Sequence, residues 1–350
     1  MQKTIALWQH RYRKYSEIAR TWLAWGKACA SVRWHSFRTG KPAVGILLAE
    51  HLGDIVSCEP LARQVRALHP DALIYWIVRK PFRELVEYNP DVDRILEEPN
   101  VLFSILLLKR SPFRKIYNLH LSNRVYEPLK KRLVNPHADA QNLTIFNYLN
   151  DRRLAEVFAD AAGLTRPDRS LAPHLHLPDR VRQQIDGLRL PQRFVVLHTY
   201  SNQPVKDWKT AYWNELAESL MRTYGPVVEV GLKAQVTSTS PSFIDLCGKL
   251  SILETAEVIR RASFFIGVDS GPAHLANAVG TYGFILIGRL GSFEDYNLYT
   301  GGYGDGSNGR LIRAASGQPA SDLRYEQVWQ PVDEYLIGRR MTEAMSRKPI

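Results

Sequence analysis

The sequence predicts an α/β protein with two Rossmann-like domains, each built on a parallel sheet, and a helical extension before them. Three observations support this class. The 350 residues suffice for two domains that each bury a hydrophobic core. Short apolar runs typical of buried strands alternate with longer amphipathic stretches typical of helices. A proline-dotted, basic stretch divides this alternation into two halves, as an interdomain linker would.

Residues 1–41 form a basic and aromatic extension. They contain nine Lys or Arg and one acid, Glu17, which gives +8 of the total formal charge of +11. Apolar residues recur at steps of three and four, on one face of an amphipathic helix: Ile5, Trp8, Tyr12, Tyr15, Ala19 and Trp22. Such a face suits an anionic membrane surface, contacted through residues 1–39, or packing against the protein body. No recognised nucleic-acid-binding motif accompanies the charge, so we expect no nucleic-acid partner.

The first domain is predicted over residues 42–185. Buried strands are expected at 44–49, 73–78, 94–96 and 115–119, with helices between them. The linker that ends this half contains Pro167, Pro173, Pro178 and Pro191.

The second domain is predicted over residues 186–324. Its strands are expected at 194–197, 227–230, 264–268 and 284–287, and a helix at 213–224. Residues 325–350 are predicted to form a helix that packs back across both domains.

Cysteine usage indicates a reducing compartment, and hydropathy predicts neither a membrane span nor a secretory signal. Cys29, Cys58 and Cys247 lie far apart and show no metal-ligand spacing, which favours the cytosol. The sequence contains no run of 18 apolar residues, so we expect no membrane span. No uninterrupted apolar segment follows the basic N-terminal residues, so we expect no secretory signal.

Residues 268–280, Val-Asp-Ser-Gly-Pro-Ala-His-Leu-Ala-Asn-Ala-Val-Gly, are the most informative stretch. They follow an apolar strand and place Asp269, Ser270 and Gly271 in a tight turn. Pro272 then suits the first position of a helix that ends near Gly280. A strand, a turn of small residues and a helix N-terminus together favour an anion, because free N–H groups and the helix dipole point at it. A diphosphate fits such a site.

This segment resembles the Asp-Ser/Thr-Gly-Pro-x-His-Leu-Ala-x-Ala-x-Gly signature of glycosyltransferase family 9, the bacterial lipopolysaccharide heptosyltransferases. The resemblance covers roughly residues 42–340. It implies the two-domain GT-B architecture, in which two parallel sheets face a central cleft. It also implies an inverting transfer of a heptose-like sugar from an ADP-linked donor to a lipopolysaccharide core or another bacterial surface glycan. A cytoplasmic enzyme, peripheral on the inner face of the inner membrane, is the corresponding expectation.

Leu52-Gly53-Asp54 follows the first strand, where the family carries a Gly-Asp pair. The resemblance assigns Asp54 the role of the general base that deprotonates the acceptor hydroxyl, with Gly53 on the acceptor side. The alternative is an acid that satisfies free N–H groups at a helix N-terminus.

In the second half, His198-Thr199-Tyr200-Ser201 and Lys206-Asp207-Trp208 resemble the family's segments at a strand end. Thr199, Ser201, Ser270 and Gly271 are predicted to bind phosphate oxygens, and Lys206 a phosphate or the ribose. Asp269 is predicted to bind a hydroxyl of the donor sugar. His274 is assigned either to a phosphate or to a local backbone group.

After Gly280 the sequence departs from the family. The usual proline at position 282 and the Thr-x-Pro loop are absent, and a Gly/Tyr-rich loop at 296–308 takes their place. We expect this loop to border the donor pocket.

Asp91-Val92-Asp93 matches the Asp-x-Asp metal motif of another class of glycosyltransferases. It lies in a turn before a short strand, and the resembled family is metal-independent, so no metal ion or other cofactor is expected.

Two other functions stay open on the sequence. One is a nucleotide-sugar epimerase or hydrolase on the same architecture, and the other is a non-catalytic, membrane-recruited binding protein. A dinucleotide oxidoreductase is disfavoured because the first strand is not followed by Gly-x-Gly-x-x-Gly.

Overall fold

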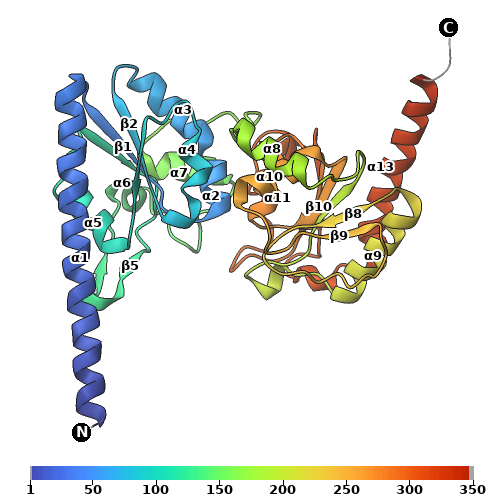
Figure 1. Cartoon of the computed structure of the whole chain (residues 1–350), viewed down its shortest axis with the longest axis horizontal. Coiled ribbons are helices and arrows are strands. Elements are labelled where there is room, and N and C mark those ends of the chain that lie inside the picture. Colours follow the sequence, from blue (N-terminus) through green and yellow to red (C-terminus); the bar gives the residue numbers. More distant parts are fainter. Residues whose placement is uncertain (1, 347–350) are drawn as a thin grey trace. The chain divides into compact units, whose positions relative to one another are not determined.

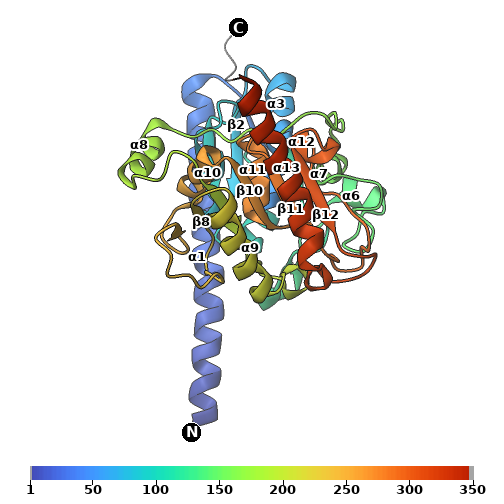
Figure 2. The same ribbon diagram turned by 90° about the vertical axis from the view of Figure 1, so that its right-hand side faces the viewer.

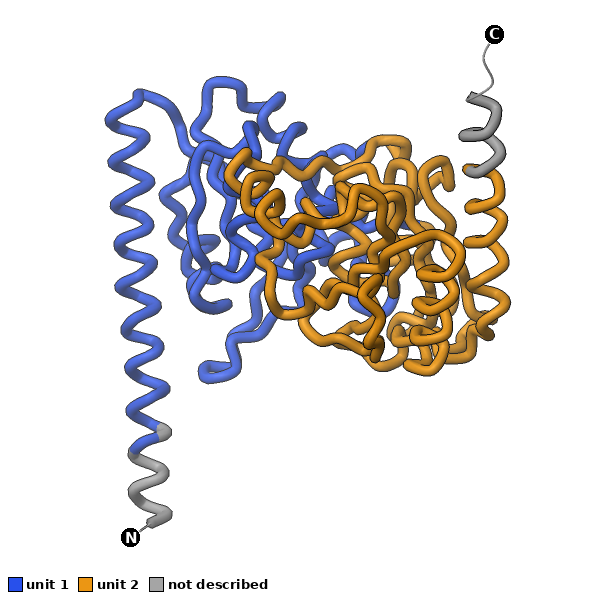
Figure 3. The backbone as a smooth tube through the Cα atoms, turned by 45° about the vertical axis from the view of Figure 1, so that its right-hand side comes forward, with its two compact units in different colours: residues 1–148, 152–167 blue, residues 149–151, 168–350 orange. Residues whose placement is uncertain are grey.

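A computed structural model confirms the GT-B-like α/β fold, with two compact units that each contain a parallel sheet (Figures 1 and 3). Unit 1 comprises residues 1–148 and 152–167, and unit 2 comprises residues 149–151 and 168–350. The structure describes residues 2–346, with the side chains of residue 9 and residues 11–339. The expectation for Ile5 and Trp8 therefore concerns side chains outside the described ones.

The sheet of unit 1 has four parallel strands in the order β3-β2-β1-β4. The strands are β1 (Ala43–Leu47), β2 (Leu73–Val78), β3 (Arg94–Glu97) and β4 (Lys115–Asn118). All four were predicted from the sequence. A short antiparallel hairpin of β5 (Val125–Tyr126) and β6 (Lys131–Arg132) follows.

Helices cover both faces of this sheet (Figure 1). One face carries α1 (Gln2–Thr39) and α5 (Val101–Lys109), and the opposite face carries α2 (Leu52–Ser57), α3 (Glu59–Leu68) and α7 (Leu154–Ala162). The short helices α4 (Glu84–Glu87) and α6 (Pro136–Ala140) complete the unit.

The N-terminal extension is one continuous helix, α1, of 38 residues. Its side toward the body buries Ala28, Cys29 and Val32, and Ile18 and Trp25 pack against the same cluster with residues of α5. Tyr12, Tyr15, Ala19 and Trp22, predicted to share one face, all lie exposed. The helix therefore packs on the body through a different face from the aromatic one.

The sheet of unit 2 has six parallel strands in the order β12-β11-β10-β7-β8-β9. The strands are β7 (Val195–His198), β8 (Val227–Glu229), β9 (Phe243–Asp245), β10 (Phe264–Val268), β11 (Gly283–Ile287) and β12 (Gly309–Arg313). The two edge strands, β9 and β12, were not predicted.

Helices α9 (Thr210–Thr223) and α13 (Tyr325–Ser346) belong to this unit (Figure 2). They bury Trp213, Val328 and Val332 in its hydrophobic core. The other helices are α8 (Asp179–Gly187), α10 (Ile252–Arg261), α11 (Gly271–Ala278) and α12 (Gly302–Asp305). The described core contacts of α13 lie in unit 2, whereas the sequence predicted packing across both domains.

The chain enters unit 2 at residue 168, before the predicted boundary at 185. Helix α8 belongs to unit 2 because Arg261 of α10 pairs with Asp186 at 2.7 Å and donates to the carbonyl of Arg182. Val181 and Ile185 are buried on the same helix.

Substitution of Val32 tests whether α1 is part of the core of unit 1. Val32 is fully buried, so Val32→Ala is expected to lower the free energy of unfolding by about 2 kcal/mol through lost burial and a residual cavity. Leu23→Ala, on the exposed side of the same helix, should change it by less than about 0.5 kcal/mol. Urea denaturation of both variants measures the difference, and equal effects would contradict this packing.

Candidate active site

The turn between β10 and α11 is built as the sequence predicted. Ser270 is the N-cap residue in an extended conformation, and Pro272 lies in the first turn of α11, where a missing N–H costs nothing. The Ser270 hydroxyl lies 3.2 Å from the Val268 carbonyl oxygen and 3.1 Å from His198 Nδ1. Pro272 has no N–H, and the Ala273 and His274 N–H groups donate to the Ser270 carbonyl at 3.1 and 3.4 Å, which leaves the Gly271 N–H as the backbone donor that this turn can offer to an anion.

Lys206 and Asp269 form a buried ion pair at the carboxyl ends of the strands. Lys206 Nζ lies 2.9 Å from Asp269 Oδ2, and their side chains are 10% and 0% exposed. Tyr296 donates to Asp269 Oδ2 at 2.8 Å and Tyr299 to Oδ1 at 2.7 Å. Burial alone would raise the pKa of Asp269, but the Lys206 ammonium outweighs it and holds that pKa below the usual value.

The site therefore holds Asp269 as a carboxylate, with both oxygens engaged by protein groups. A carboxylate has about four acceptor positions, so a sugar hydroxyl could still reach it, and this contact stays a prediction. The Tyr299 hydroxyl keeps its proton at any ordinary pH and donates a hydrogen bond to Asp269, because burial and then Asp269 raise its pKa well above 10. Two of the three Lys206 N–H bonds are not accounted for by the pair with Asp269.

Two histidines of the site are neutral at pH 7. Burial lowers the pKa of both His198 and His274 to about 4. The His274 ring lies 4.6 Å from the ring of Tyr299, centroid to centroid. His274 therefore adds no positive charge at neutral pH, and binding of a phosphate would rely on a neutral ring N–H.

The two predicted phosphate-binding hydroxyls in the segment that follows β7 already have hydrogen-bond partners within the protein. Thr199 donates to Glu229 Oε1 at 2.6 Å, and Ser201 donates to the Gln203 carbonyl at 2.8 Å. Glu229, at the end of β8, also accepts the Gln235 N–H at 2.9 Å, and burial raises its pKa. Contacts of Thr199 and Ser201 with phosphate stay predictions.

In unit 1, Asp54 lies at the third position of α2. Its Oδ2 accepts the His51 N–H at 3.3 Å, which is the helix-capping role that the sequence left open. The Asp54 side chain is only partly buried, and Gly53 precedes it in the same turn. Capping fixes the carboxylate at the end of β1 and is compatible with a role as a base.

A buried ionic network holds the loop that leads to Asp54. Arg124 donates to Glu50 at 3.1 Å and to both oxygens of Glu98, at 2.9 and 2.7 Å. The Glu98 side chain is 0% exposed. His120 Nε2 accepts the Ala49 N–H at 2.9 Å, and burial keeps its pKa well below 6.5. The carboxyl end of β1 is thus fixed from two sides, and nothing in the sequence pattern identified this network.

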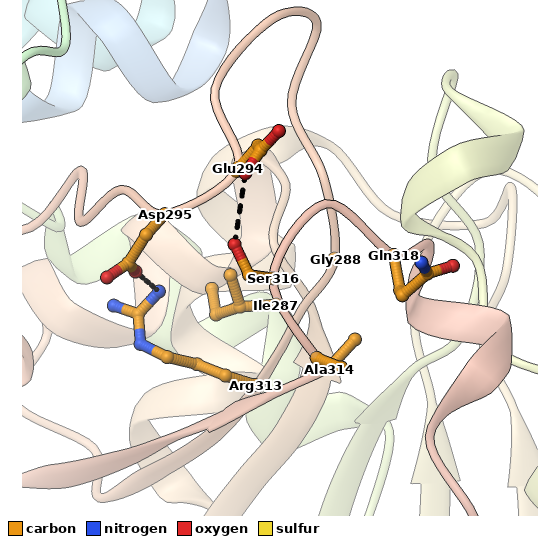
Figure 4. Close-up of a pocket in the computed structure, with 9 residues that line it drawn as sticks. Ile287, Gly288, Glu294, Asp295, Arg313, Ala314, Ser316 and Gln318 are labelled. Carbon is orange, nitrogen blue, oxygen red and sulfur yellow. Dashed lines mark hydrogen bonds and ion pairs between the residues drawn. The ribbon is translucent and has the colours of Figure 1, made fainter.

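A polar pocket of about 180 Å³ lies at the carboxyl ends of β11 and β12 (Figure 4). Asp295 pairs with Arg313 at 3.0 Å, and the Ser316 hydroxyl donates to Glu294 at 3.2 Å. Arg313 also donates to the Tyr296 carbonyl at 2.7 Å. The pocket thus adjoins the loop whose tyrosine contacts Asp269.

Asp93 has a structural role. Its Oδ2 accepts Arg66 at 2.6 Å and the Ile74 N–H at 2.7 Å. Among the described side chains, those of residue 9 and residues 11–339, no group of three or more His, Cys, Asp or Glu has the arrangement of a metal site.

Residues 82–284, more than half of the chain, match the sequence profile of glycosyltransferase family 9 (heptosyltransferase). The chain belongs to this family. The matched residues include Lys206, Asp269 and His274, and Asp54 lies before them.

Lipopolysaccharide heptosyltransferase 3 of Escherichia coli is 33% identical over 120 residues. This match covers 31% of the chain and 35% of that relative. The chain therefore spans about a third of the length of the curated relative that it matches.

Two solved structures share the fold across most of both chains. A glycosyl transferase family 9 protein from Veillonella parvula has a TM-score of 0.65 at 18% identity, covering 85% of this chain and 98% of that one. The E. coli ADP-heptose lps heptosyltransferase II has a TM-score of 0.64 at 18% identity, covering 85% and 99%.

The pH dependence of stability tests the buried histidines. Because the folded-state pKa of His198 lies below the ordinary 6.5, the unfolded chain binds this proton first as the pH falls. His198 alone should therefore cost about 3 kcal/mol of stability between pH 6.5 and pH 4.

His198→Asn should flatten the dependence of unfolding free energy on pH in that window. Ser270→Ala removes a neighbour but keeps the buried ring, so it should retain the wild-type slope. Denaturant titrations from pH 4 to pH 7 measure both slopes. Identical slopes for His198→Asn and the wild type would contradict a buried neutral histidine.

Proposed function

We propose that this protein is an inverting glycosyltransferase that moves a sugar from a nucleoside diphosphate donor to a hydroxyl of a bacterial surface glycan. The observation that carries the proposal is the Lys206–Asp269 pair beside the N-terminus of α11, in a chain of family 9. This arrangement would offer a cation, the Ser270 hydroxyl and the Gly271 N–H to one anion.

The donor diphosphate would lie at the turn before α11. Lys206 would donate its remaining N–H bonds to phosphate oxygens, with Ser270 and the Gly271 N–H as further donors. These fixed donors would stabilise the charge that develops when the bond between the sugar carbon and the diphosphate oxygen breaks. Asp269 would keep Lys206 in place and charged, so its first role is positioning.

Asp54 would be the general base. The acceptor oxygen forms a bond to the anomeric carbon as the diphosphate leaves with the bonding electron pair, and Asp54 takes the acceptor proton. Attack opposite to the leaving group inverts the configuration at that carbon. The fixed carboxylate at the N-terminus of α2 supports this role.

We further propose a heptose-like sugar carried on ADP, and a lipopolysaccharide core as the acceptor. The support is the description of the relatives, one an ADP-heptose heptosyltransferase and one a lipopolysaccharide heptosyltransferase. The enzyme would act at the cytoplasmic side of the inner membrane. Among the described residues, no helix is both long and apolar enough to cross a bilayer.

Calorimetry with a panel of nucleoside diphosphates tests the donor site. Lys206→Met should weaken binding of the preferred diphosphate about tenfold to a hundredfold, because a charge-assisted hydrogen bond is lost. Lys209→Met, an exposed lysine three residues away, is the matched control and should bind within about twofold of wild type. Because Lys206→Met leaves Asp269 buried without its cation, Ser270→Ala provides a second variant with the pair intact, and it should bind a few-fold more weakly. Equal affinities in all variants would contradict this site.

Product formation from ADP-heptose and a heptose-deficient lipopolysaccharide core tests the catalytic assignment. Asp54→Asn should lower kcat by about 10²–10⁴-fold and leave donor affinity unchanged, because general-base catalysis is lost. Asp91→Asn, from the Asp-x-Asp segment, is the control carboxylate and should retain activity, also in EDTA. Donor consumption without acceptor product would instead indicate an epimerase or hydrolase. No donor binding at all would indicate a non-catalytic protein.

A further inference from the structure

We propose that the outer face of α1 docks on an anionic phospholipid bilayer, with the helix axis parallel to the membrane. The outer face is defined by Tyr12, Ala19, Leu23, Ala30, Trp34 and Phe37, all of them exposed. The inference extends the proposed function, from which it takes only a lipid-borne acceptor.

These residues lie along one line of the helix. Successive members are seven, four, seven, four and three residues apart, close to whole numbers of turns at 3.6 residues per turn. Tyr12 is 73% exposed, Leu23 66%, and Phe37 84%. Single exposed apolar residues are normal on a protein surface, but a continuous stripe marks an interaction site.

Among the described residues, the rest of unit 1 does not pack against this stripe. Unit 1 contacts α1 through Ile18, Trp25, Ala28 and Val32, which lie on the other side of the helix. In Figure 1, α1 runs along the edge of unit 1, beside α5 and β5. The helix therefore packs on unit 1 through one face while its outer face stays exposed.

Cations flank the stripe on both sides. At 100° per residue, Arg20, Lys27 and Arg38 follow one edge of the outer face and Arg33 the other, and all four are exposed. Long basic side chains beside an apolar stripe can extend toward lipid phosphates while the aromatic rings enter the headgroup region.

The one acid of residues 1–41 faces the body. Glu17 Oε1 accepts from Asn100 Nδ2 at 3.1 Å and from the Tyr126 hydroxyl at 3.0 Å. The hydroxyl of Tyr126 stays protonated, because burial and Glu17 raise its pKa to about 12. The outer face thus presents positive charge with no acid among residues 1–41 to offset it.

This charge favours a lipid surface over a second copy of the chain. Two α1 helices packed through their outer faces would bring together two segments of +8 each. An anionic bilayer attracts the same charge, and its attraction weakens with salt.

Flotation of the full chain with lipid vesicles, without donor or acceptor, tests the inference. We expect binding to phosphatidylglycerol/phosphatidylethanolamine vesicles at low salt, and binding at least about tenfold weaker to phosphatidylcholine vesicles. Trp34→Ser/Phe37→Ser should weaken binding about tenfold or more, and so should Arg20→Glu/Lys27→Glu. These positions are exposed, and circular dichroism and the Tm should confirm that the variants fold.

Matched controls lie in unit 2. Leu232→Ser removes an apolar side chain that is 91% exposed, and Lys209→Glu/Lys233→Glu reverses two exposed lysines. Both should bind vesicles like the wild type. If the controls weaken binding as much as the α1 variants, the attraction is non-specific and the proposal is overturned.

Self-association is the other outcome that would overturn it. Light scattering after size-exclusion chromatography would then show an oligomer that Trp34→Ser/Phe37→Ser dissociates, with vesicle binding absent or unchanged. Neither readout depends on catalysis, so an inactive protein that binds vesicles would overturn the proposed function and leave this inference standing.

Discussion

The buried pair of Lys206 and Asp269 is the interaction on which the second unit's site depends. It joins the segment after β7 to the turn after β10, and Tyr296 and Tyr299 attach the following loop to the same carboxylate. An ion pair out of water needs further hydrogen bonds to offset the loss of hydration, and the two tyrosine hydroxyls donate two such bonds to Asp269. Lys206, Asp269, Tyr296 and Tyr299 therefore connect the loops at this edge of the sheet and also fix the position of the Lys206 ammonium group.

Unit 1 uses the same physical solution with different residues. Arg124, Glu98 and Glu50 join loops that follow β4, β3 and β1, again at the carboxyl ends of parallel strands. Open α/β sheets bind ligands at that edge, where loops diverge and the backbone groups need partners. Each unit fixes its edge with a buried ion pair, and each leaves a predicted site residue beside it, Asp54 in one and Ser270 in the other.

Local sequence signals predicted what local physics decides. Strands β1, β2, β7, β10 and β11 are apolar runs, whereas β3, β4 and β8 each combine two adjacent apolar residues with polar ones. The Pro-started helix α11 follows from its own turn. The missed strands β9 and β12 are edge strands of mixed polarity, and so are β3 and β4, which were predicted, so mixed polarity weakens this signal without removing it. The Tyr296 and Tyr299 contacts with Asp269 and the Arg124 network join residues 26 to 74 positions apart, so only the tertiary fold creates them.

The N-terminal helix shows why periodicity alone left two interpretations open. A step of three or four residues places apolar side chains on one face, but it does not say whether that face meets protein or another apolar phase. Helix α1 carries two such faces, one centred near Trp25 and Val32 and one near Leu23 and Ala30. Among the described residues, only the first face packs against a complementary surface, on α5. The second face is bordered by cations, and Glu17 faces the protein body instead. An anionic bilayer surface would complement this composition, so one helix could pack on the protein body and contact a membrane through opposite faces.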